Sequence, residues 1–457
     1  MAAKLCASQS GMIVSADSVQ AYRGVMIGAN KPTEEERLET PHMLVDVVDH
    51  RTANYNAADW QRDALHVISK LLADGSTIHT ETIPSDDDSE DERTIKQARE
   101  RQRDIDKALA DARKLKGYSE EEPLLPVVVG GTMMYLQWLV HGRPDASKPS
   151  LTAVAQAQNE MTSFQSSDNW EGAVHHVASH GPIFEQRIAK LCGRDWYRLR
   201  RTLEIALTAQ EEQQQKQGLR EDDKAKHNDI IEKLFTGERV GGLDTLGYDV
   251  RCFFLCPDDR MKHTELVDER CEIMLTRGLL DETASLYLAG ELPEMAARAI
   301  GYRQTLDYLE REGAKDGDED ALNEYLNQFT TATRRYSKKQ MQWFRKDDIF
   351  TFVPIKISDE KAKRVDDAAR IIGDLIQLSR DEYDQQCFAE DSVSAKTMKE
   401  NEAQGKGMKF YQFKRFILKP GTPELQQVLV EADRCSNQVQ AKKQRVSTEA
   451  DAESDTA

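Results

Sequence analysis

The chain has no apolar run that approaches the roughly 18 residues needed to span a bilayer. It has only seven cysteines in 457 residues, and these lie far apart. Scattered cysteines in a long chain are typical of reduced thiols in an intracellular compartment. The N-terminus carries neither the basic start and apolar core of a signal peptide nor an Arg-rich transit pattern. We therefore expect an intracellular protein without a membrane span, and the sequence does not indicate which compartment.

Metal-binding patterns are also sparse. Cys252 and Cys256 lie in the apolar run CFFLC, where a strand would place both on one face as core residues rather than as half of a metal site. No histidine follows His263, so the C-terminal region cannot build a zinc finger with two histidines. The sequence therefore predicts no metal site built by protein ligands alone.

Charge is unevenly distributed. The 80 Asp and Glu residues outnumber the 62 Lys and Arg residues, which gives a formal net charge of −18. This balance argues against a protein that coats nucleic acid over its whole surface. Residues 333–346, TRRYSKKQMQWFRK, nevertheless contain several Lys and Arg residues and no acid. A local basic face remains compatible with the composition.

The stretch MIVSADSVQAYR, residues 12–23, begins as a buried strand and then delivers several polar side chains, of which Asp17 is the first acid. In an open α/β sheet, ligands bind at the carboxyl ends of the strands, so Asp17 is a candidate general base. The pair Asp17-Ser18 could instead cap the following turn, because both residue types are favoured N-caps. The spacing alone leaves both interpretations open.

A second strand pattern ends in a glycine-rich turn. Residues 124–129 form a continuous apolar run of the kind found in buried parallel strands. Gly130, Gly131 and Thr132 then lead into the helical pattern MMYLQWLVHG. A turn between a buried strand and a helix can face a ligand with backbone N–H groups and one hydroxyl. The two patterns together predict an α/β protein with a parallel sheet.

Coarse patterns divide the chain into four parts. We expect an insertion at 76–122, with an acidic start and a charged helix at about 93–116, and interpret it as a solvated excursion without chemistry. The patch at 408–420 could be a strand or an ancillary RNA contact. The expected parts are the first part of an α/β core (1–149), a helical region (150–236), the second part of the core (237–380), and a polar, partly disordered tail (381–457).

Three further motifs follow in order: GRDWYRLRRTLEI, RAIGYRQ at 298–304, and the basic segment at 333–346. With the two strand-end motifs, they make the chain resemble the tRNA dimethylallyltransferase family, also called tRNA isopentenyltransferases, over residues 1 to about 379. The resemblance implies a P-loop NTPase-like parallel sheet with an inserted helical domain that binds tRNA. In that family a strand and a loop of the form G-P-T-x-x-G-K-[ST] precede this region, and no such loop occurs here. We expect either a fragment of a longer protein or an impaired paralogue, so the first strand and P-loop would be missing.

The resemblance implies transfer of a dimethylallyl group from dimethylallyl diphosphate to N6 of an adenosine beside the anticodon. It implies Mg²⁺ as cofactor, the tRNA anticodon stem-loop as partner, and we expect a monomer. Asp17 would be the general base, and Thr132 and Arg298 would meet the departing diphosphate. The residues that would contact tRNA are Ser18, Val19, Gln20, Arg198, Arg201, Arg303, Lys338, Lys339, Gln340 and Arg345.

Some alternatives stay open. The cations of these motifs could be solvated surface residues, and Trp343 and Phe344 are expected to pack in the core rather than to stack on bases. A close rival function is an adenylate isopentenyltransferase of cytokinin synthesis, although the long helical middle and the basic segment favour tRNA. A rival of another class is a catalytically silent relative that binds RNA, which the absent phosphate loop makes credible.

Overall fold

The structure is a computed structural model. It describes the whole chain except residues 50–54, 74–91, 145–148, 190, 192–193, 216–238, 312–313, 316, 358–359, 406 and 455–457. The chain divides into two compact units: residues 1–140 with 246–457 form unit 1, and residues 141–245 form unit 2. The acidic start of the predicted insertion lies mostly outside the described residues.

The first sheet of unit 1 contains three parallel strands in the order β2-β1-β3: β1 (Gly11–Ala16), β2 (His42–Met43) and β3 (Leu125–Gly130). All six residues of β1 are buried, as its apolar sequence predicts. β1 pairs with β3 along its whole length, from Gly11 opposite Leu125 to Ala16 opposite Gly130. The two strand ends that precede Asp17 and the GGT turn are therefore neighbours.

A second pair of parallel strands, β6 (Cys252–Pro257) and β7 (Phe350–Ile355), has helices on both faces. Phe253 packs with Leu5 of α1 (Ala2–Gln9) and Ile372 of α16 (Lys361–Ile376). Phe254 packs in a second cluster with residues of α5 (Met133–His141) and α15 (Glu319–Phe344). Neighbouring strand residues point to opposite faces, so each side of the pair is covered by its own helices.

The core interpretation of the two cysteines in β6 is confirmed. Cys256 is buried in the cluster around Phe254, and Cys252 packs against the same cluster. Both carry free thiols, and burial raises the pKa of the Cys256 thiol to about 11. These sulfurs belong to the hydrophobic core, as predicted.

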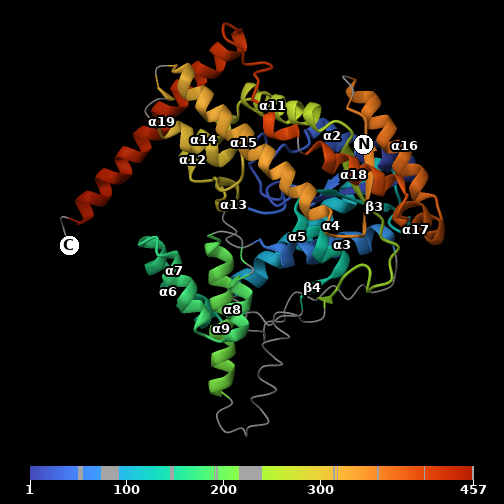
Figure 1. Cartoon of the computed structure of the whole chain (residues 1–457), viewed down its shortest axis with the longest axis horizontal. Coiled ribbons are helices and arrows are strands. Elements are labelled where there is room, and N and C mark those ends of the chain that lie inside the picture. Colours follow the sequence, from blue (N-terminus) through green and yellow to red (C-terminus); the bar gives the residue numbers. More distant parts are fainter. Residues whose placement is uncertain are drawn as a thin grey trace. The chain divides into compact units, whose positions relative to one another are not determined.

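The helices before and after β2 have well-defined N-terminal ends. α2 (Glu34–Glu39) begins with a capping box between Thr33 and Glu36, and α3 (Ala57–Leu72) begins with one between Asn56 and Asp59. Unit 1 also contains four consecutive helices: α11 (Arg260–Thr276), α12 (Leu279–Ala289), the short α13 (Glu294–Ala297) and α14 (Tyr302–Leu309). α12 and α14 pack against the long C-terminal helix α19 (Pro423–Ser454), as Figure 1 shows.

The segment predicted as a polar, partly disordered tail contains α17 (Arg380–Phe388), α18 (Val393–Gln404), the short 3₁₀ helix η2 (Gly407–Phe410) and α19. The buried carboxylate of Glu272 accepts hydrogen bonds from the backbone N–H groups of Phe416, Ile417 and Leu418, at 3.0, 2.7 and 2.7 Å. Of the two options for the patch at 408–420, the strand is wrong, because these residues form η2 and an irregular segment, and the ancillary RNA contact stays a prediction. The patch is docked on α11 through its backbone.

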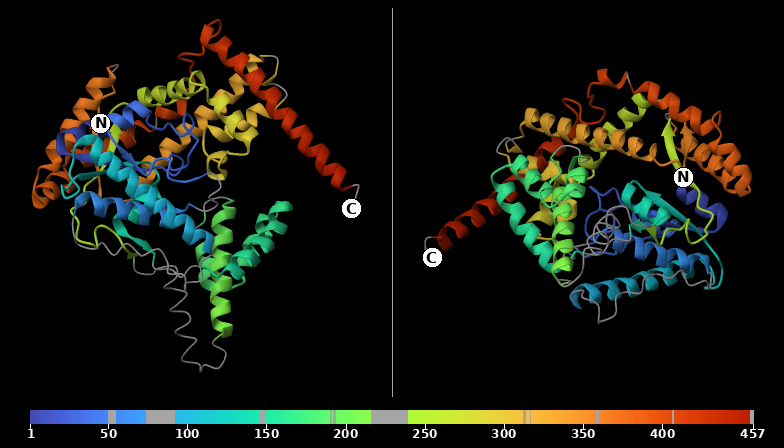
Figure 2. Two further views of the ribbon diagram at one scale, coloured as in Figure 1. Left: turned by 180° about the vertical axis from the view of Figure 1, so that it is seen from behind. Right: turned by 60° about the horizontal axis from the view of Figure 1, so that its bottom comes forward.

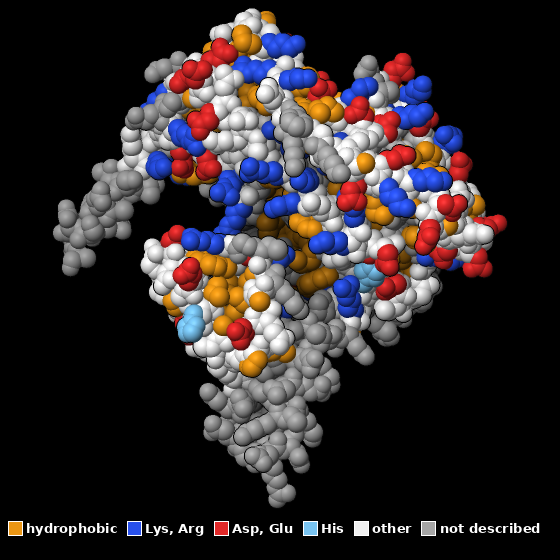
Figure 3. All heavy atoms as spheres, in the orientation of Figure 1, with side chains coloured by type: hydrophobic (Ala, Val, Ile, Leu, Met, Phe, Trp, Pro, Cys, Tyr) orange, Lys and Arg blue, Asp and Glu red, His pale blue; other side chains and the backbone are white. Residues whose placement is uncertain are grey.

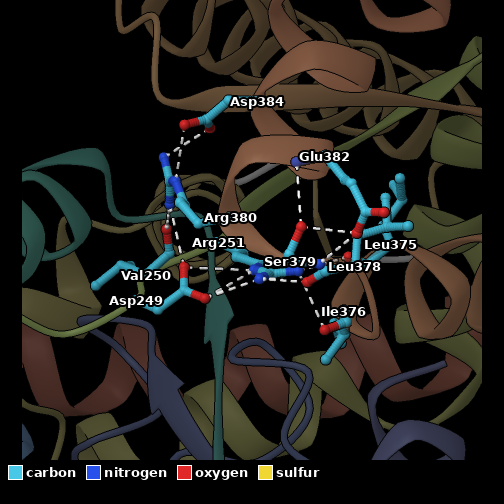
Figure 4. Close-up of polar contacts among 10 residues, drawn as sticks. All are labelled: Asp249, Val250, Arg251, Leu375, Ile376, Leu378, Ser379, Arg380, Glu382 and Asp384. Atoms are coloured by element: carbon cyan, nitrogen blue, oxygen red, sulfur yellow. Dashed lines mark hydrogen bonds and ion pairs between the residues drawn. The ribbon is translucent and has the colours of Figure 1, made fainter.

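An arginine cluster ties α17 to the second sheet. Arg251, at the start of β6, donates to the backbone carbonyls of Leu375 and Leu378, at 2.7 and 2.8 Å, at the C-terminal end of α16 (Figure 4). Asp249 accepts from Arg251 at 2.8 Å and from Arg380 at 3.2 Å. Carbonyls at a helix C-terminus lack partners within the helix, so Arg251 serves as a cap between distant parts of the chain.

The helix of the predicted insertion, α4 (Glu92–Lys116), lies beside α3 (Figure 2). The prediction of a solvated excursion is wrong for this helix. Its buried apolar residues recur at helical spacing: Ile95, Ala98, Ile105, Leu109 and Ala112. Two of its arginines are also buried, Arg101 with 7% and Arg113 with 4% of its surface exposed. Arg101 pairs with Asp63 of α3, and Arg113 donates to carbonyls of α3 and of the segment 119–122, which the sequence pattern of α4 alone could not reveal.

Unit 2 is helical, with α6 (Leu151–Ser166), α7 (Trp170–Ala178), α8 (Pro182–Ala189) and α9 (Trp196–Gln215). A two-stranded antiparallel pair, β4 (Arg143–Pro144) and β5 (Arg239–Val240), also lies within it. Its core contains apolar residues of α6 and α9, among them Ala157, Met161, Leu199 and Leu203. Within the described parts of both units, every helix is too short or too polar to cross a membrane.

Candidate active site

Asp17 follows the last residue of β1 and its side chain is half-buried. Its Oδ1 accepts hydrogen bonds from the backbone N–H groups of Val19 and Gln20, at 2.8 and 3.2 Å. The capping interpretation is therefore correct, and it is compatible with the catalytic one. The two N–H groups hold the carboxylate in one orientation at the carboxyl end of the sheet, where ligands bind in this class of fold.

The GGT turn joins this loop directly. The backbone N–H of Thr132 donates to the Ala16 carbonyl, and the Ser18 backbone N–H donates to Thr132 Oγ1, both at 3.3 Å. A Cβ atom on Gly130 would lie 2.2 Å from the Ala16 carbonyl oxygen, so this strand end tolerates no larger residue. The turn thus places the Thr132 hydroxyl against the residue that follows Asp17.

Helix α15 closes the other side of the turn. The Gly131 carbonyl accepts from Gln340 Nε2 at 3.0 Å and from the Tyr336 hydroxyl at 3.4 Å. Burial raises the pKa of Tyr336, and the negative charge of Asp17 raises it further. Of the predicted site residues, the structure therefore brings together Asp17, Ser18, Thr132 and Gln340. Tyr336 was missed, although it lies four residues before Gln340 and so on the same helix face.

Two stacked aromatic rings lie next to the Asp17 loop. Trp60 of α3 donates its Nε1–H to the Ser15 carbonyl at 2.9 Å. Its ring stacks on that of Tyr135, with 4.5 Å between the ring centroids and 12° between the planes. Burial raises the pKa of Tyr135 well above its usual range, and the charges of Tyr22 and Asp17 add to the effect. Trp60 is one of the buried residues of α3, and helical spacing alone does not link it to the site.

The RAIGYRQ motif docks onto the loop that follows Asp17. The Glu282 carboxylate accepts from the backbone N–H groups of Ile27 and Gly28 and from the Tyr302 hydroxyl, at 2.8, 3.1 and 2.6 Å. A Cβ atom on Gly28 would lie 2.4 Å from the Tyr302 ring. The RAIGYRQ motif therefore makes a close approach to this loop through Tyr302.

The two arginines of this motif point outward. Arg298 has 76% of its side chain exposed and pairs with Glu294 at 2.5 Å. Arg303 has 68% exposed, with Asp307 at 4.0 Å. Burial raises the pKa of Tyr22 in the Asp17 loop, and the charges of Asp59 and Glu294 raise it further.

Other predicted contact residues have structural partners. The Gln20 amide nitrogen donates to the carbonyls of Ala29 and Asn30, each at 3.2 Å, and its oxygen accepts from the Ser15 hydroxyl at 3.0 Å. Gln20 therefore closes the loop from within, and Ser18 and Val19 form the half-buried turn between it and Asp17.

The basic segment of α15 divides by exposure. Lys338 and Lys339 are exposed, and Figure 3 shows Lys and Arg side chains gathered on the face over α13 and α15. Arg345 is only 19% exposed and donates to Asn401 of α18 at 3.0 Å. Phe344 is buried as predicted, but the core prediction is wrong for Trp343, which is 37% exposed and meets Tyr336 edge-on with ring centroids 6.2 Å apart.

In unit 2, the predicted tRNA contacts lie on α9. Arg198 is 62% exposed and lies 3.4 Å from Asp195, and Arg201 is 42% exposed and lies 2.7 Å from Glu204. Both arginines are therefore accessible. The Arg198–Asp195 pair is partly exposed and can exchange partners at little cost, whereas Arg201 pairs with Glu204, whose side chain is only 6% exposed.

The chemistry of a diphosphate implies Mg²⁺, so the side chains of the candidate site can be compared with the ligands that this ion prefers. Mg²⁺ prefers six oxygen ligands and usually keeps several waters. Asp17 and Thr132 offer one carboxylate and one hydroxyl, and the described residues contain no group of three or more His, Cys, Asp and Glu side chains placed for a metal ion. These residues do not by themselves form a magnesium site.

Comparison with solved structures defines the fold. A crystal structure of a eukaryotic dimethylallyltransferase acting on tRNA matches with a TM-score of 0.52 and 16% identity, over 98% of this chain and 95% of that chain. The predicted α/β fold class is thereby confirmed. The IPP transferase family model matches residues 20–78 and 102–347, which is more than half of the sequence. The chain belongs to the IPP transferase family.

Two relatives are similar over most of the chain. The tRNA dimethylallyltransferase 9 of Arabidopsis thaliana is 30% identical over 366 residues, covering 77% of this chain and 67% of the relative. The tRNA dimethylallyltransferase of Protochlamydia amoebophila is 28% identical over 364 residues, covering 79% of this chain and 81% of the relative.

Proposed function

We propose that this protein transfers a dimethylallyl group from dimethylallyl diphosphate to the exocyclic N6 of an adenosine beside the anticodon of tRNA. The family and the names of its relatives support the proposal. The observation that carries it is the fixed Asp17 carboxylate at the end of β1, beside the Thr132 hydroxyl at the end of β3.

Asp17 is proposed to act as the general base. The N6 amine is a poor nucleophile because its lone pair is delocalised into the adenine ring. A carboxylate that accepts an N6 proton as the new C–N bond forms can contribute a rate factor of about 10²–10⁴. The hydrogen bonds from Val19 and Gln20 keep this carboxylate in place, so it needs no reorganisation when the reaction occurs.

The leaving diphosphate needs positive charge and hydrogen-bond donors. Thr132 is proposed to donate its hydroxyl to a diphosphate oxygen. Arg298 is proposed to exchange Glu294 for the diphosphate, because the existing pair is exposed and costs little to break. Mg²⁺, if bound, would be held mainly by the diphosphate and would neutralise its charge.

The RNA is proposed to lie on the exposed cations. Lys338 and Lys339 of α15 belong to the helix that also carries Gln340, whose amide holds the GGT turn. Arg198 and Arg201 on α9 and Arg303 on α14 are exposed as well. Contacts of this kind to phosphates would offset the cost of taking the adenine out of its stack, a few kcal/mol.

The test is Asp17→Asn in the full chain. Asparagine keeps an oxygen for the Val19 and Gln20 N–H groups but cannot accept the N6 proton. Incorporation of labelled dimethylallyl into tRNA should fall about 10²- to 10⁴-fold while tRNA affinity is unchanged. Asp320→Asn, an exposed acid in the first turn of α15, is the matched control and should retain the rate.

Three results would overturn the proposal. Undiminished transfer by Asp17→Asn would remove the base from the mechanism. Transfer by the unsubstituted chain to AMP rather than to tRNA would indicate an adenylate isopentenyltransferase. Salt-dependent binding of an anticodon stem-loop without any turnover would indicate a silent RNA-binding relative.

A further inference from the structure

Helix α4 contacts the loop that carries Asp17, and the family model matches only the second part of this helix. The match stops at residue 78 and resumes at residue 102, so the first part of α4, including Arg101, lies in the unmatched interval. The helix nevertheless packs a continuous stripe of apolar residues against its surroundings. Both the unmatched start and the matched remainder of α4 therefore belong to the packed core.

The central contact of α4 is a buried ion pair with α3. Arg101 Nε lies 2.6 Å from Asp63 Oδ2, and the side chains are 7% and 5% exposed. The Arg101 guanidinium also lies over the Tyr55 ring, 4.9 Å from its centroid, and the Tyr55 hydroxyl donates to the same Asp63 oxygen at 3.1 Å. Burying two charges is costly unless their geometry is good, so this pair is a specific feature of the packing.

This buried cluster reaches the Asp17 loop through Tyr55 and Tyr22. The hydroxyl of Tyr22 lies against the backbone of Tyr55, and Tyr22 is itself buried. Tyr22 belongs to the loop that begins at Asp17, and its backbone N–H donates to the Val19 carbonyl at 3.1 Å. The route from α4 therefore runs from Arg101 to Asp63, to Tyr55 and then to Tyr22.

A second contact reaches the same loop from the surface. Arg23 Nη2 donates to Asp104 of α4 at 3.0 Å, with both side chains at least half exposed. Asp104 lies three residues after Arg101 and so on a neighbouring position of the helix. The same helix thus meets consecutive loop residues, Tyr22 through the buried cluster and Arg23 directly.

We propose that α4 holds the loop that carries Asp17 in place, and that Arg101 is the residue of α4 that positions this loop. Arg101 acts through Asp63 and Tyr55 and does not touch the substrate. The proposal rests on the proposed function for its catalytic consequence, but the effect on the loop is independent of it. Misplacing a reacting group by about 1 Å can cost about 10²-fold in rate, so a distant support of this kind can matter.

The chain offers a matched control on the same helix. Arg113 is also buried, at 4%, and donates to the carbonyls of Lys70 and Leu71 at the end of α3, at 3.0 and 3.3 Å. It therefore docks α4 on α3 as Arg101 does, but at the end of α3 that is remote from Asp63. Loss of Arg113 should weaken the docking without releasing the loop.

The experiment compares Arg101→Met with Arg113→Met by hydrogen exchange and by kinetics. Arg101→Met should speed exchange of the Val19, Gln20, Tyr22 and Arg23 amides by about tenfold or more, and Arg113→Met should leave these amides unchanged. In the prenyl-transfer assay, Arg101→Met should lower kcat by about 10-fold or more, with KM for tRNA changed less than about twofold. Arg101→Lys, which keeps a charge for Asp63, should recover part of both effects.

Removal of Arg101 alone leaves Asp63 buried without its partner, so the double variant Arg101→Met with Asp63→Asn is included. It should regain thermal stability but keep the fast loop exchange and the low kcat. The proposal is overturned if Arg101→Met leaves loop exchange unchanged, or if Arg113→Met accelerates it equally. Absence of prenyl transfer in all chains would count against the proposed function, while the exchange data would still decide the role of α4.

Discussion

Helices α15 and α4 each pair an arginine with a buried aspartate of a neighbouring helix, although the sequence predicts opposite roles for the two helices. The basic α15 is expected to offer its cations to RNA, and the mixed-charge α4 is expected to be solvated. In the structure, Arg334 of α15 pairs with Asp268 of α11 at 2.6 Å, and Arg101 of α4 pairs with Asp63 of α3 at 2.6 Å. Each arginine is paired on the side where its helix packs.

The difference between the two helices lies in what remains exposed. On α15, Arg335, Lys338 and Lys339 are left on an outer face without acidic neighbours in the sequence. On α4, exposed cations such as Arg103 and Lys107 alternate with acids such as Asp104 and Asp106. A phosphate backbone is attracted by the first pattern and much less by the second. The exposed remainder, rather than the total charge of a helix, therefore indicates an RNA-binding face.

The largest expected effect concerns the pair that Arg334 of α15 makes with the buried Asp268. Arg334→Met leaves the Asp268 carboxylate, which is 0% exposed, with the Tyr411 hydroxyl as its remaining described partner. Breaking a buried pair in this way should lower the free energy of unfolding by about 3 kcal/mol. Urea unfolding of Arg334→Met and of the exposed neighbour Arg335→Met measures the contrast, and the second variant should stay within about 0.5 kcal/mol of the parent. Equal losses would erase the distinction between the two faces of α15.

Sequence patterns recovered the elements of this fold because apolar periodicity is a local property. The strand at β1, the GGT turn after β3 and the helix at 93–116 were all predicted close to their observed ends. Asp17 and Thr132 were also found from sequence, because residues that follow parallel strands meet at one edge of the sheet.

The partners of the buried charges could not be predicted in the same way. Arg101 and Asp63 are 38 residues apart, and Arg334 and Asp268 are 66 apart. Nothing in either local sequence distinguishes these arginines from the exposed ones beside them. Arg345 and Gln20 illustrate the same limit, since each was proposed to contact RNA and each is held by a partner from another segment or loop.

A middle-sized effect is expected for the exposed cations of α15. The double variant Lys338→Ala with Lys339→Ala should weaken binding of an anticodon stem-loop and reduce the slope of log affinity against log salt by about 1.5 to 2. Stability should be unchanged, because both side chains are exposed.

The matched control comes from α4. Arg103→Ala with Lys107→Ala removes the same charge from exposed positions of that helix and should leave the salt slope as it is. A similar reduction from both double variants would mean that RNA responds to net charge and not to the pattern on α15.

The smallest effect is expected where an arginine pair is half exposed. The Asp249 carboxyl accepts hydrogen bonds from Arg251, and these, together with Arg380, lower its pKa although burial opposes the shift. Because the folded state then binds the Asp249 proton less readily than the unfolded state, the carboxylate stabilises the fold above its ordinary pKa of about 3.9. That contribution is lost as the pH falls through the lowered folded value. Since the Asp249 side chain is 49% exposed, we expect this carboxylate to contribute less than about 1 kcal/mol to the free energy of unfolding.

Comparison of the parent chain with Asp249→Asn by urea unfolding tests this sign. The difference in free energy of unfolding should be full at neutral pH and should shrink below about pH 4. In an Arg251→Met background the same substitution should lose most of its pH dependence, because the main cause of the lowered pKa is gone. The contrary result is a parent chain that gains stability relative to Asp249→Asn as the pH falls. Asp249 would then resemble a buried carboxyl such as Asp268, whose pKa is raised by burial, and the distinction between half-exposed and buried pairs would be lost.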